Sequence, residues 1–204
     1  MDELGRSIFD RFPDLYADWI TSFESNQGSK LFFNSIVTFP LLKGNHADLF
    51  KLFLPIIWNN AAEQSVQALL HPNTVYTETH GNSLRLETYH RIRKHYSFIN
   101  KDKELLFKDI DDHIEFSINV YGNRSNSVNF KSISNLYAPL TIKRCSIPSS
   151  KPVQGKVDNN GKWNKEGHPN RVLHYDDIAL AAIAEVFGGN VTCPMLPSIH
   201  ASET

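Results

Sequence analysis

The chain contains 204 residues, 41% of them hydrophobic and 21% charged, which is the balance of an ordinary soluble globular protein. Its length suffices for one domain with a sizeable core. The formal net charge of −1 excludes recognition of nucleic acid through bulk basicity, so any such contact requires a local patch.

The cysteine and hydropathy patterns predict a soluble, cytoplasmic protein. The two cysteines, Cys145 and Cys193, show no CxxC spacing and fit a reducing compartment. No apolar run reaches the ~18 residues of a membrane span. The longest run, LFKLFLPIIW, is interrupted by Lys51 and Pro55. The start of the chain lacks the basic region and apolar core of a signal peptide.

Helices are predicted for the first part of the chain. Aromatic residues at helical spacing over 6–24 predict two short helices divided at Pro13, or a helix and a turn, followed by a polar break over 24–30. Residues 31–42 predict a further short helix or an irregular packed segment. A helix over 48–59 is predicted to contain Pro55 and to bury a continuous apolar stripe. That stripe consists of Leu49, Phe50, Phe53, Leu54, Ile57 and Trp58.

Strands and helices then alternate up to Gly122, which predicts an α/β sheet with one antiparallel hairpin near its edge. The elements are a strand over 65–72 that ends in proline, a turn over 77–82, a helix over 83–96, a strand near 98–99 and a strand over 113–120. The outer face of the helix over 83–96 is predicted to carry Arg85, Arg91, Arg93 and Lys94.

The remainder of the chain is richer in turn-forming residues. We predict an edge strand over 135–142, because Pro139 cannot donate a ladder hydrogen bond. The sequence 158–161 predicts a hairpin turn, and Asp176 predicts the cap of a helix over 177–187. The tail from Asn190 onward is predicted to be loose.

Generic catalytic motifs are absent from the sequence: there is no GxGxxG, GxxxxGK[ST], HExxH or GxSxG. We predict no metal site, because His90 and His95 lie five positions apart and do not share a helix face. The acidic pair Asp111-Asp112 indicates a solvated loop. The basic face that includes Arg91, Arg93 and Lys94 could contact the phosphates of DNA or be an ordinary solvated surface.

The order of elements over 48–122 resembles the second half of an S-adenosylmethionine-dependent DNA adenine methyltransferase. The likeness is greatest to the large type IIG restriction–modification enzymes and their relatives in phage defence. The stretches that carry it are, in order, DLFKLFLPIIW, SVQALLHP, SLRLETYHRIRKHY, the Leu106-Phe107 pair and IEFSINVYG. Later stretches, NLYAPLTI and 155–187, are similar to the region that follows the catalytic domain in those enzymes.

The resemblance implies a partial Rossmann-like sheet made of the later strands, followed by a loop-rich α+β region. Three parts are expected: an aromatic-rich helical lead-in over 1–45, the methyltransferase-like part over 46–122, and a linker with the start of a target-recognition region over 123–204. The implied partner is DNA, and the implied cofactor of the complete enzyme is S-adenosylmethionine.

Two aromatic residues match positions with roles in the family. Phe53 falls where an aromatic ring packs against the adenine of the cofactor. Phe107 falls where a phenylalanine packs on the target adenine after that base has left the duplex. The alternative for each is a plain packing residue.

The chain departs from the family in two respects. It contains no [NDS]-P-P-[YFW] loop, which holds the target amino group, and no glycine loop for the cofactor near its start. The resemblance therefore implies a truncated product or a split subunit, inactive by itself, whose missing motifs come from another chain encoded upstream. The alternatives are a non-catalytic interaction module and a non-functional remnant.

Overall fold

The computed structural model describes residues 3–45, 48–158 and 160–202. The chain forms two compact units, Met1–Pro55 and Ile56–Thr204. Within the described ranges, no helix has both the length and the apolar character needed to cross a bilayer. The predicted turn over 158–161 includes Asn159, which lies outside the described residues, and the strand-like bridge between Val157 and Trp163 flanks it.

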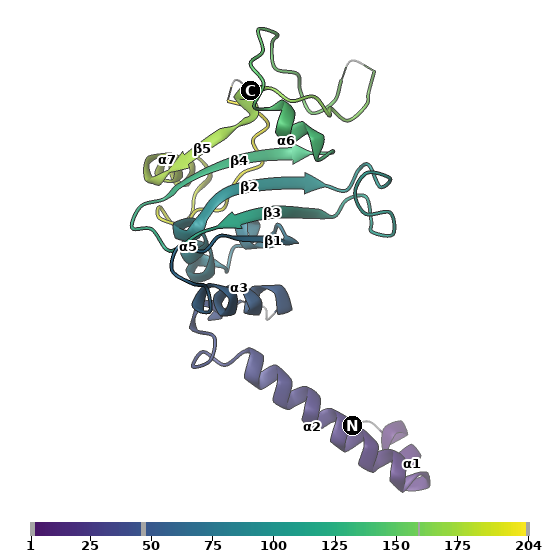
Figure 1. Ribbon diagram of the computed structural model, residues 1–204. Helices are drawn as coiled ribbons and strands as arrows, with labels where there is room; N and C mark the ends of the chain where they lie inside the picture. The colour runs from purple at the N-terminus through teal and green to yellow at the C-terminus, as the bar shows by residue number, and fades with distance from the viewer. Residues whose placement is uncertain (1–2, 46–47, 159, 203–204) are drawn as a thin grey trace. The chain divides into compact units, whose positions relative to one another are not determined.

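The first unit is helical (Figure 1). Its elements are α1 (Glu3–Arg11), α2 (Pro13–Phe33), the 3-10 helix η1 (Pro40–Leu42) and the first part of α3 (Leu49–Asn59). Pro13 begins α2, because the first helical position needs no amide donor. The predicted polar break over 24–30 is wrong: these residues continue α2, since glutamine, lysine and serine are tolerated at exposed helical positions.

α3 confirms the predicted helix and contains Pro55. The predicted apolar stripe is only partly buried, because Leu49 and Phe53 are 61% and 55% exposed. In α2 the rings of Tyr16, Trp19 and Phe23 form a stacked series along the helix, and none of its described residues is buried.

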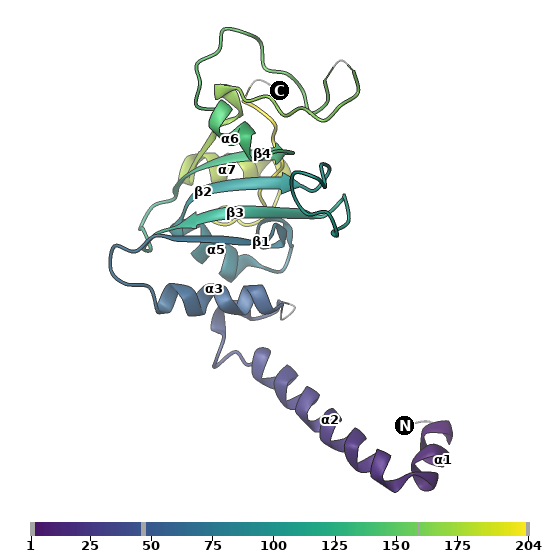
Figure 2. The same ribbon diagram turned by 45° about the vertical axis from the view of Figure 1, so that its right-hand side comes forward.

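The second unit contains a five-stranded mixed sheet with helices, in the strand order β1-β3-β2-β4-β5 (Figures 1 and 2). The strands are β1 (Gln67–Pro72), β2 (Ile92–Ile99), β3 (Glu115–Tyr121), β4 (Asn129–Leu136) and β5 (Leu173–Asp176). Only β2 and β4 pair in parallel, and every other neighbouring pair is antiparallel. The mixed α/β class is thus confirmed. The antiparallel strand β3 lies one position inside the β1 edge.

The helices of this unit are α4 (Thr74–Thr77), α5 (Asn82–Arg91), α6 (Leu140–Arg144), the 3-10 helix η2 (Pro169–Arg171) and α7 (Asp177–Phe187). The predicted strands at β1 and β3 and the predicted helix α7 are confirmed. Asp176 caps α7 by accepting a 2.8 Å hydrogen bond from the amide of Ala179.

Three predictions about the sheet and its helices are wrong. The predicted helix over 83–96 ends at Arg91, because Ile92 begins β2 and its backbone pairs with β3 and β4. Arg85, expected on the outside, is 2% exposed. The predicted edge strand over 135–142 divides into the end of the internal strand β4 and the helix α6, with Pro139 just before that helix.

The tail from Asn190, predicted to be loose, packs against α5 and α4. The guanidinium Nε of Arg85 donates to the carbonyl of Cys193 at 2.9 Å, and the Tyr89 hydroxyl donates to the carbonyl of Pro194 at 2.7 Å. The amide of Leu196 donates to the carbonyl of Tyr76. Backbone carbonyls of the tail thus accept hydrogen bonds from two buried polar side chains of α5.

The two faces of the sheet differ in character. On one face Phe98, Phe116, Ile133 and Leu136 form an apolar cluster, which Cys145 beside α6 completes. The opposite face, next to α4 and α5, buries an unusual number of polar side chains. They are His71, Asn73, His95, Ser97, Ser117, Asn119, Ser132 and Ser134.

Hydrogen bonds connect these buried polar side chains across the strands. His71 contacts the Tyr121 hydroxyl at 2.8 Å, and the Tyr76 hydroxyl donates to Asn119 at 2.6 Å. His95 bridges the Ser132 hydroxyl at 2.9 Å and the Asn73 side-chain oxygen at 3.1 Å. Burial, and secondarily the nearby His71, lowers the pKa of His95 to about 3. Burial also lowers the pKa of His71.

These buried imidazoles make stability depend on pH. Between pH 6.5 and about 3 the unfolded chain holds a proton on residue 95 that the folded protein lacks. Stability is therefore full above pH 6.5 and falls as the pH is lowered toward 3. We expect His95 to contribute a loss of about 2 kcal/mol in the free energy of unfolding between pH 7.5 and pH 5.

Urea denaturation at the two pH values checks this expectation. His95→Gln should remove most of that contribution, whereas the same substitution at the exposed His174 should leave the pH dependence intact. Equal pH dependence in the wild type and in His95→Gln would show that His95 is not held neutral by burial.

Candidate functional site

The loop over 100–114, which joins β2 to β3, is anchored by one buried side chain. Asn100 is fully buried, and its side-chain oxygen accepts a 3.0 Å hydrogen bond from the amide of Phe107. Its side-chain nitrogen donates to the carbonyls of Phe107 at 2.8 Å, Ile110 at 3.0 Å and Asp111 at 3.2 Å. The position of Phe107 is therefore fixed from the loop's interior.

Phe107 is 39% exposed and lies against the sheet rather than inside it. Its ring meets Phe116 of β3 edge to face, with centroids 5.0 Å apart. Phe116 in turn stacks on Phe98 of β2, with ring centroids 5.3 Å apart. The ring of Phe107 thus has an aromatic support and a solvent-facing surface, which is the arrangement that a base-stacking platform needs.

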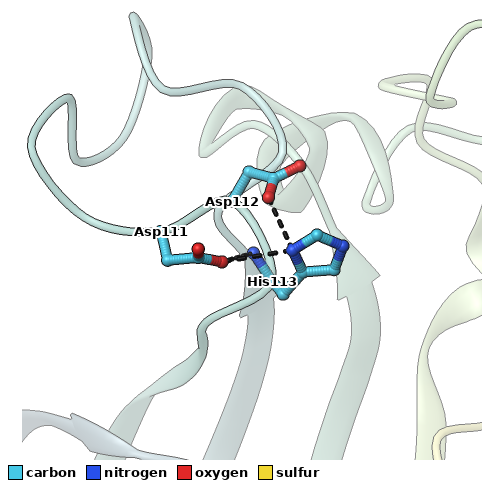
Figure 3. A group of neighbouring side chains, drawn as sticks. All are labelled: Asp111, Asp112 and His113. Carbon is cyan, nitrogen blue, oxygen red and sulfur yellow. Dashed lines mark hydrogen bonds and ion pairs between the residues drawn. The ribbon is translucent and has the colours of Figure 1, made fainter.

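The same loop ends in a cluster of titratable side chains, shown in Figure 3. The Nδ1 atom of His113 lies 3.1 Å from a carboxylate oxygen of Asp111 and 2.6 Å from one of Asp112. Asp112 also forms an ion pair with Lys101 at 3.0 Å. Hydrogen bonds from His113 lower the pKa of Asp111, and the Lys101 hydrogen bond lowers that of Asp112. Both carboxylates already have side-chain partners within the loop, His113 for the two of them and Lys101 for Asp112, so the cluster is explained as loop structure.

Of the three residues predicted to contact DNA phosphates, two have internal partners. Arg91 forms an ion pair with Glu87 and lies over the ring of Trp58, 4.9 Å from its centroid. Arg93 donates to the carbonyls of Arg91 and Ile92 at 3.0 and 3.1 Å, at the end of α5.

Glu87 holds a second arginine. The Nε atom of Arg124 lies 3.0 Å from its carboxylate. Although burial raises the pKa of Glu87, the hydrogen bonds from Arg124 and Arg91 outweigh that effect and lower it. The one carboxylate of Glu87 thus holds two guanidinium groups, those of Arg91 and Arg124, in fixed positions.

Lys94 differs from both arginines. Its side chain is exposed on β2, and in the described ranges it forms no ion pair. Its register partner on β4 is Lys131, which is also exposed. Of the three predicted residues, Lys94 is the one whose side chain is left exposed without an ion pair among the described residues. Lys131, which was not predicted from the sequence, lies beside it.

Phe53, predicted to contact the cofactor, belongs to the first unit and is 55% exposed in α3. Its exposure leaves the ring available to a purine. Phe53 and Phe107 lie in different units.

Sequence reasoning missed Asn100 and Lys131. Asn100 directly follows β2, and an asparagine at the end of a strand often stabilises a turn through its side chain. Its position could therefore have indicated a role in the loop. The alternation in NFKSISNL over β4 could have placed Lys131 and Ile133 on one face. That signal was lost because the strand was predicted to begin at residue 135.

No protein-family model and no curated protein matches the chain. Among solved structures, it is similar to a modification subunit assigned to a type I restriction enzyme of Vibrio vulnificus YJ016, with 10% identity and a TM-score of 0.45. That similarity covers 78% of this chain and 34% of that protein. It is also similar to the type IIG restriction endonuclease BpuSI, with 12% identity and a TM-score of 0.35, over 71% of this chain and 15% of that one. The chain thus spans about a third or less of the length of these proteins.

Removal of the Asn100 side chain should release the loop that carries Phe107. Asn100→Ala deletes four hydrogen bonds, and we expect the free energy of unfolding to fall by about 2–3 kcal/mol. Trypsin should also cleave faster after Lys103 and Lys108 in the same loop. The matched control is Asn126→Ala at an exposed position. Unchanged cleavage and stability in Asn100→Ala would mean that the loop is held by other contacts.

Proposed function

We propose that this chain is a subunit or part of a DNA adenine methyltransferase of the restriction–modification or phage-defence kind. The observation that carries the proposal is the platform at Phe107. An exposed aromatic ring, backed by Phe116, is fixed by Asn100 at the end of a mixed sheet. Its place in the chain, after the proline-ended β1 and the crossover helix α5, is the one that the family resemblance implies.

The chemistry of base modification explains why such a platform is useful. An enzyme that acts on an adenine in a duplex must extrude the base and hold it against an apolar surface. Stacking of a base on an aromatic ring contributes about 1–3 kcal/mol. Phe107 supplies that surface in the proposal, and Phe53 supplies an aromatic contact for the adenine of S-adenosylmethionine.

Methyl transfer itself requires groups that this sequence does not contain. The resemblance implies a polar side chain and a carbonyl from an [NDS]-P-P-[YFW] loop to hold the adenine amino group, and a glycine loop to hold the cofactor. We propose that a second chain supplies both. The chain alone is therefore expected to bind and not to methylate.

Phe107 can be tested by binding to a duplex that carries one mismatched adenine, because a mismatch lowers the cost of extrusion. We expect Phe107→Ala to weaken binding about 5- to 150-fold, as the loss of one stacking contact requires. Phe107→Tyr should retain the affinity, because it keeps the aromatic face. Leu105→Ala, at a 53% exposed position of the same loop, is the matched control. If Phe107→Ala binds as the wild type does, Phe107 does not contact the base.

Calorimetry with S-adenosylmethionine, in the presence and absence of the adenine duplex, tests the cofactor. We expect heat of binding that Phe53→Ala diminishes, because the substitution removes the ring that would stack on the purine. Leu49→Ala, exposed in the same helix, is the control. No heat with either ligand would overturn the methyltransferase proposal and favour the alternative of a non-catalytic interaction module.

A further inference from the structure

One row of residues across the sheet places two lysines side by side on a single face. The register pairs Lys94 of β2 with Lys131 of β4, and Lys131 with His174 of β5. Residues paired in register lie side by side on the same face, with neighbouring strands about 4.8 Å apart. The face on which this row lies is the one that carries Tyr96, Phe98 and the apolar cluster.

Two like charges directly opposite one another destabilise a sheet. Lys94 and Lys131 are in that arrangement, and no carboxylate neutralises either of them in the part of the chain that the structure describes. The carboxylate on the same face, that of Asp176 at the far end of β5, already caps α7. Repulsion within such a lysine pair lowers the stability of the fold, whereas an anion bound between the two ammonium groups would relieve that repulsion.

The lysines border a hollow of about 530 Å³. Lys143 of α6 lines it from a third element, and Tyr96, Ile133 and Val172 contribute an apolar and aromatic floor. No acidic side chain is among the described residues that line it. The hollow therefore combines three ammonium groups with a surface on which a ring can lie.

We propose that this surface, Lys94, Lys131 and Lys143 around Tyr96, binds the phosphate backbone of nucleic acid. A phosphate offers several acceptor oxygens, so two ammonium groups at the spacing of adjacent strands can share one phosphate. The aromatic ring beside them suits a base or sugar, and basic grooves that contain aromatic side chains are typical of nucleic-acid binding. An acidic peptide would use the charges and leave the ring without a role.

The position of Phe107 on the same face strengthens the inference. Phe107 contacts Phe116, which pairs in register with Phe98, and Phe98 lies four residues along β2 from Lys94. Four residues of strand span about 13 Å, close to four base-pair steps. One nucleic acid can then reach both the lysines and the aromatic platform. The choice of DNA as the nucleic acid rests on the proposed function, whereas the phosphate site itself does not.

The test is fluorescence anisotropy with a labelled DNA duplex and its single strand, each over a series of salt concentrations. In the triple variant Lys94→Gln, Lys131→Gln and Lys143→Gln we expect at least about tenfold weaker binding at low salt. The slope of log affinity against log salt should fall by about 2–3, since each lost phosphate contact removes about 0.9. The control replaces Lys151, Lys156 and Lys162 by glutamine, which removes the same charge from exposed positions of another loop.

Misfolding does not obscure the result, because removal of opposed like charges should leave the melting temperature unchanged or raise it. An unaltered salt slope in the lysine variant, or equal binding of polyglutamate by the wild type, would overturn the proposal. If only the proposed function is wrong, the result differs. The lysine variant would still lose DNA binding, whereas Phe107→Ala would bind DNA as the wild type does and S-adenosylmethionine would give no heat of binding. Absence of wild-type binding to both the DNA duplex and the single strand would overturn the phosphate surface itself, because the phosphate groups that the lysines would contact are common to all nucleic acids.

Discussion

A layer of buried, hydrogen-bonded polar side chains fixes how the strands of this protein pair. His71, Asn119, His95 and Ser132 come from four neighbouring strands, and each finds its partner only in the observed register. A shift of one residue would turn these groups to the opposite face and leave them unpaired. Because a buried polar group without a partner costs about 1–3 kcal/mol, the layer specifies one pairing and excludes its neighbours.

The opposite face follows from that register. The β2–β3 register places Phe116 beside Phe98, and the β2–β4 register places Lys94 beside Lys131. The loop after β2 then returns across the end of this face, where Asn100 fixes it and Phe107 rests on Phe116. The residues proposed to bind nucleic acid and the buried polar layer thus lie on opposite faces of the sheet, so substitutions of the former should leave the latter intact.

Prediction from sequence succeeded where one periodicity dominated. Residues 115–121 alternate, α7 carries a cap and a helical run, and both were predicted correctly. It failed at Ile92 and Tyr96, which lie four positions apart and satisfy both the helical repeat and the strand repeat. Pairing with two strands decided between the two repeats. The buried tail was missed because its partners, Arg85 and Tyr89, lie more than one hundred positions away along the chain.

Residue types and spacings along the chain were sufficient to predict the alternation of helices and strands and the place of Phe107 before an antiparallel strand, and they exclude an [NDS]-P-P-[YFW] loop from this sequence. These are local features, set by residue type and spacing over a few positions. Which basic residues have internal partners could be learned only from the folded arrangement. Arg91 and Arg93 have internal partners, whereas Lys94 is left exposed beside Lys131. The reason is that folding pairs some basic side chains with carboxylates or carbonyls and leaves others exposed. Several of these pairing groups come from elements distant in the chain, so the sequence does not show which side chains they meet.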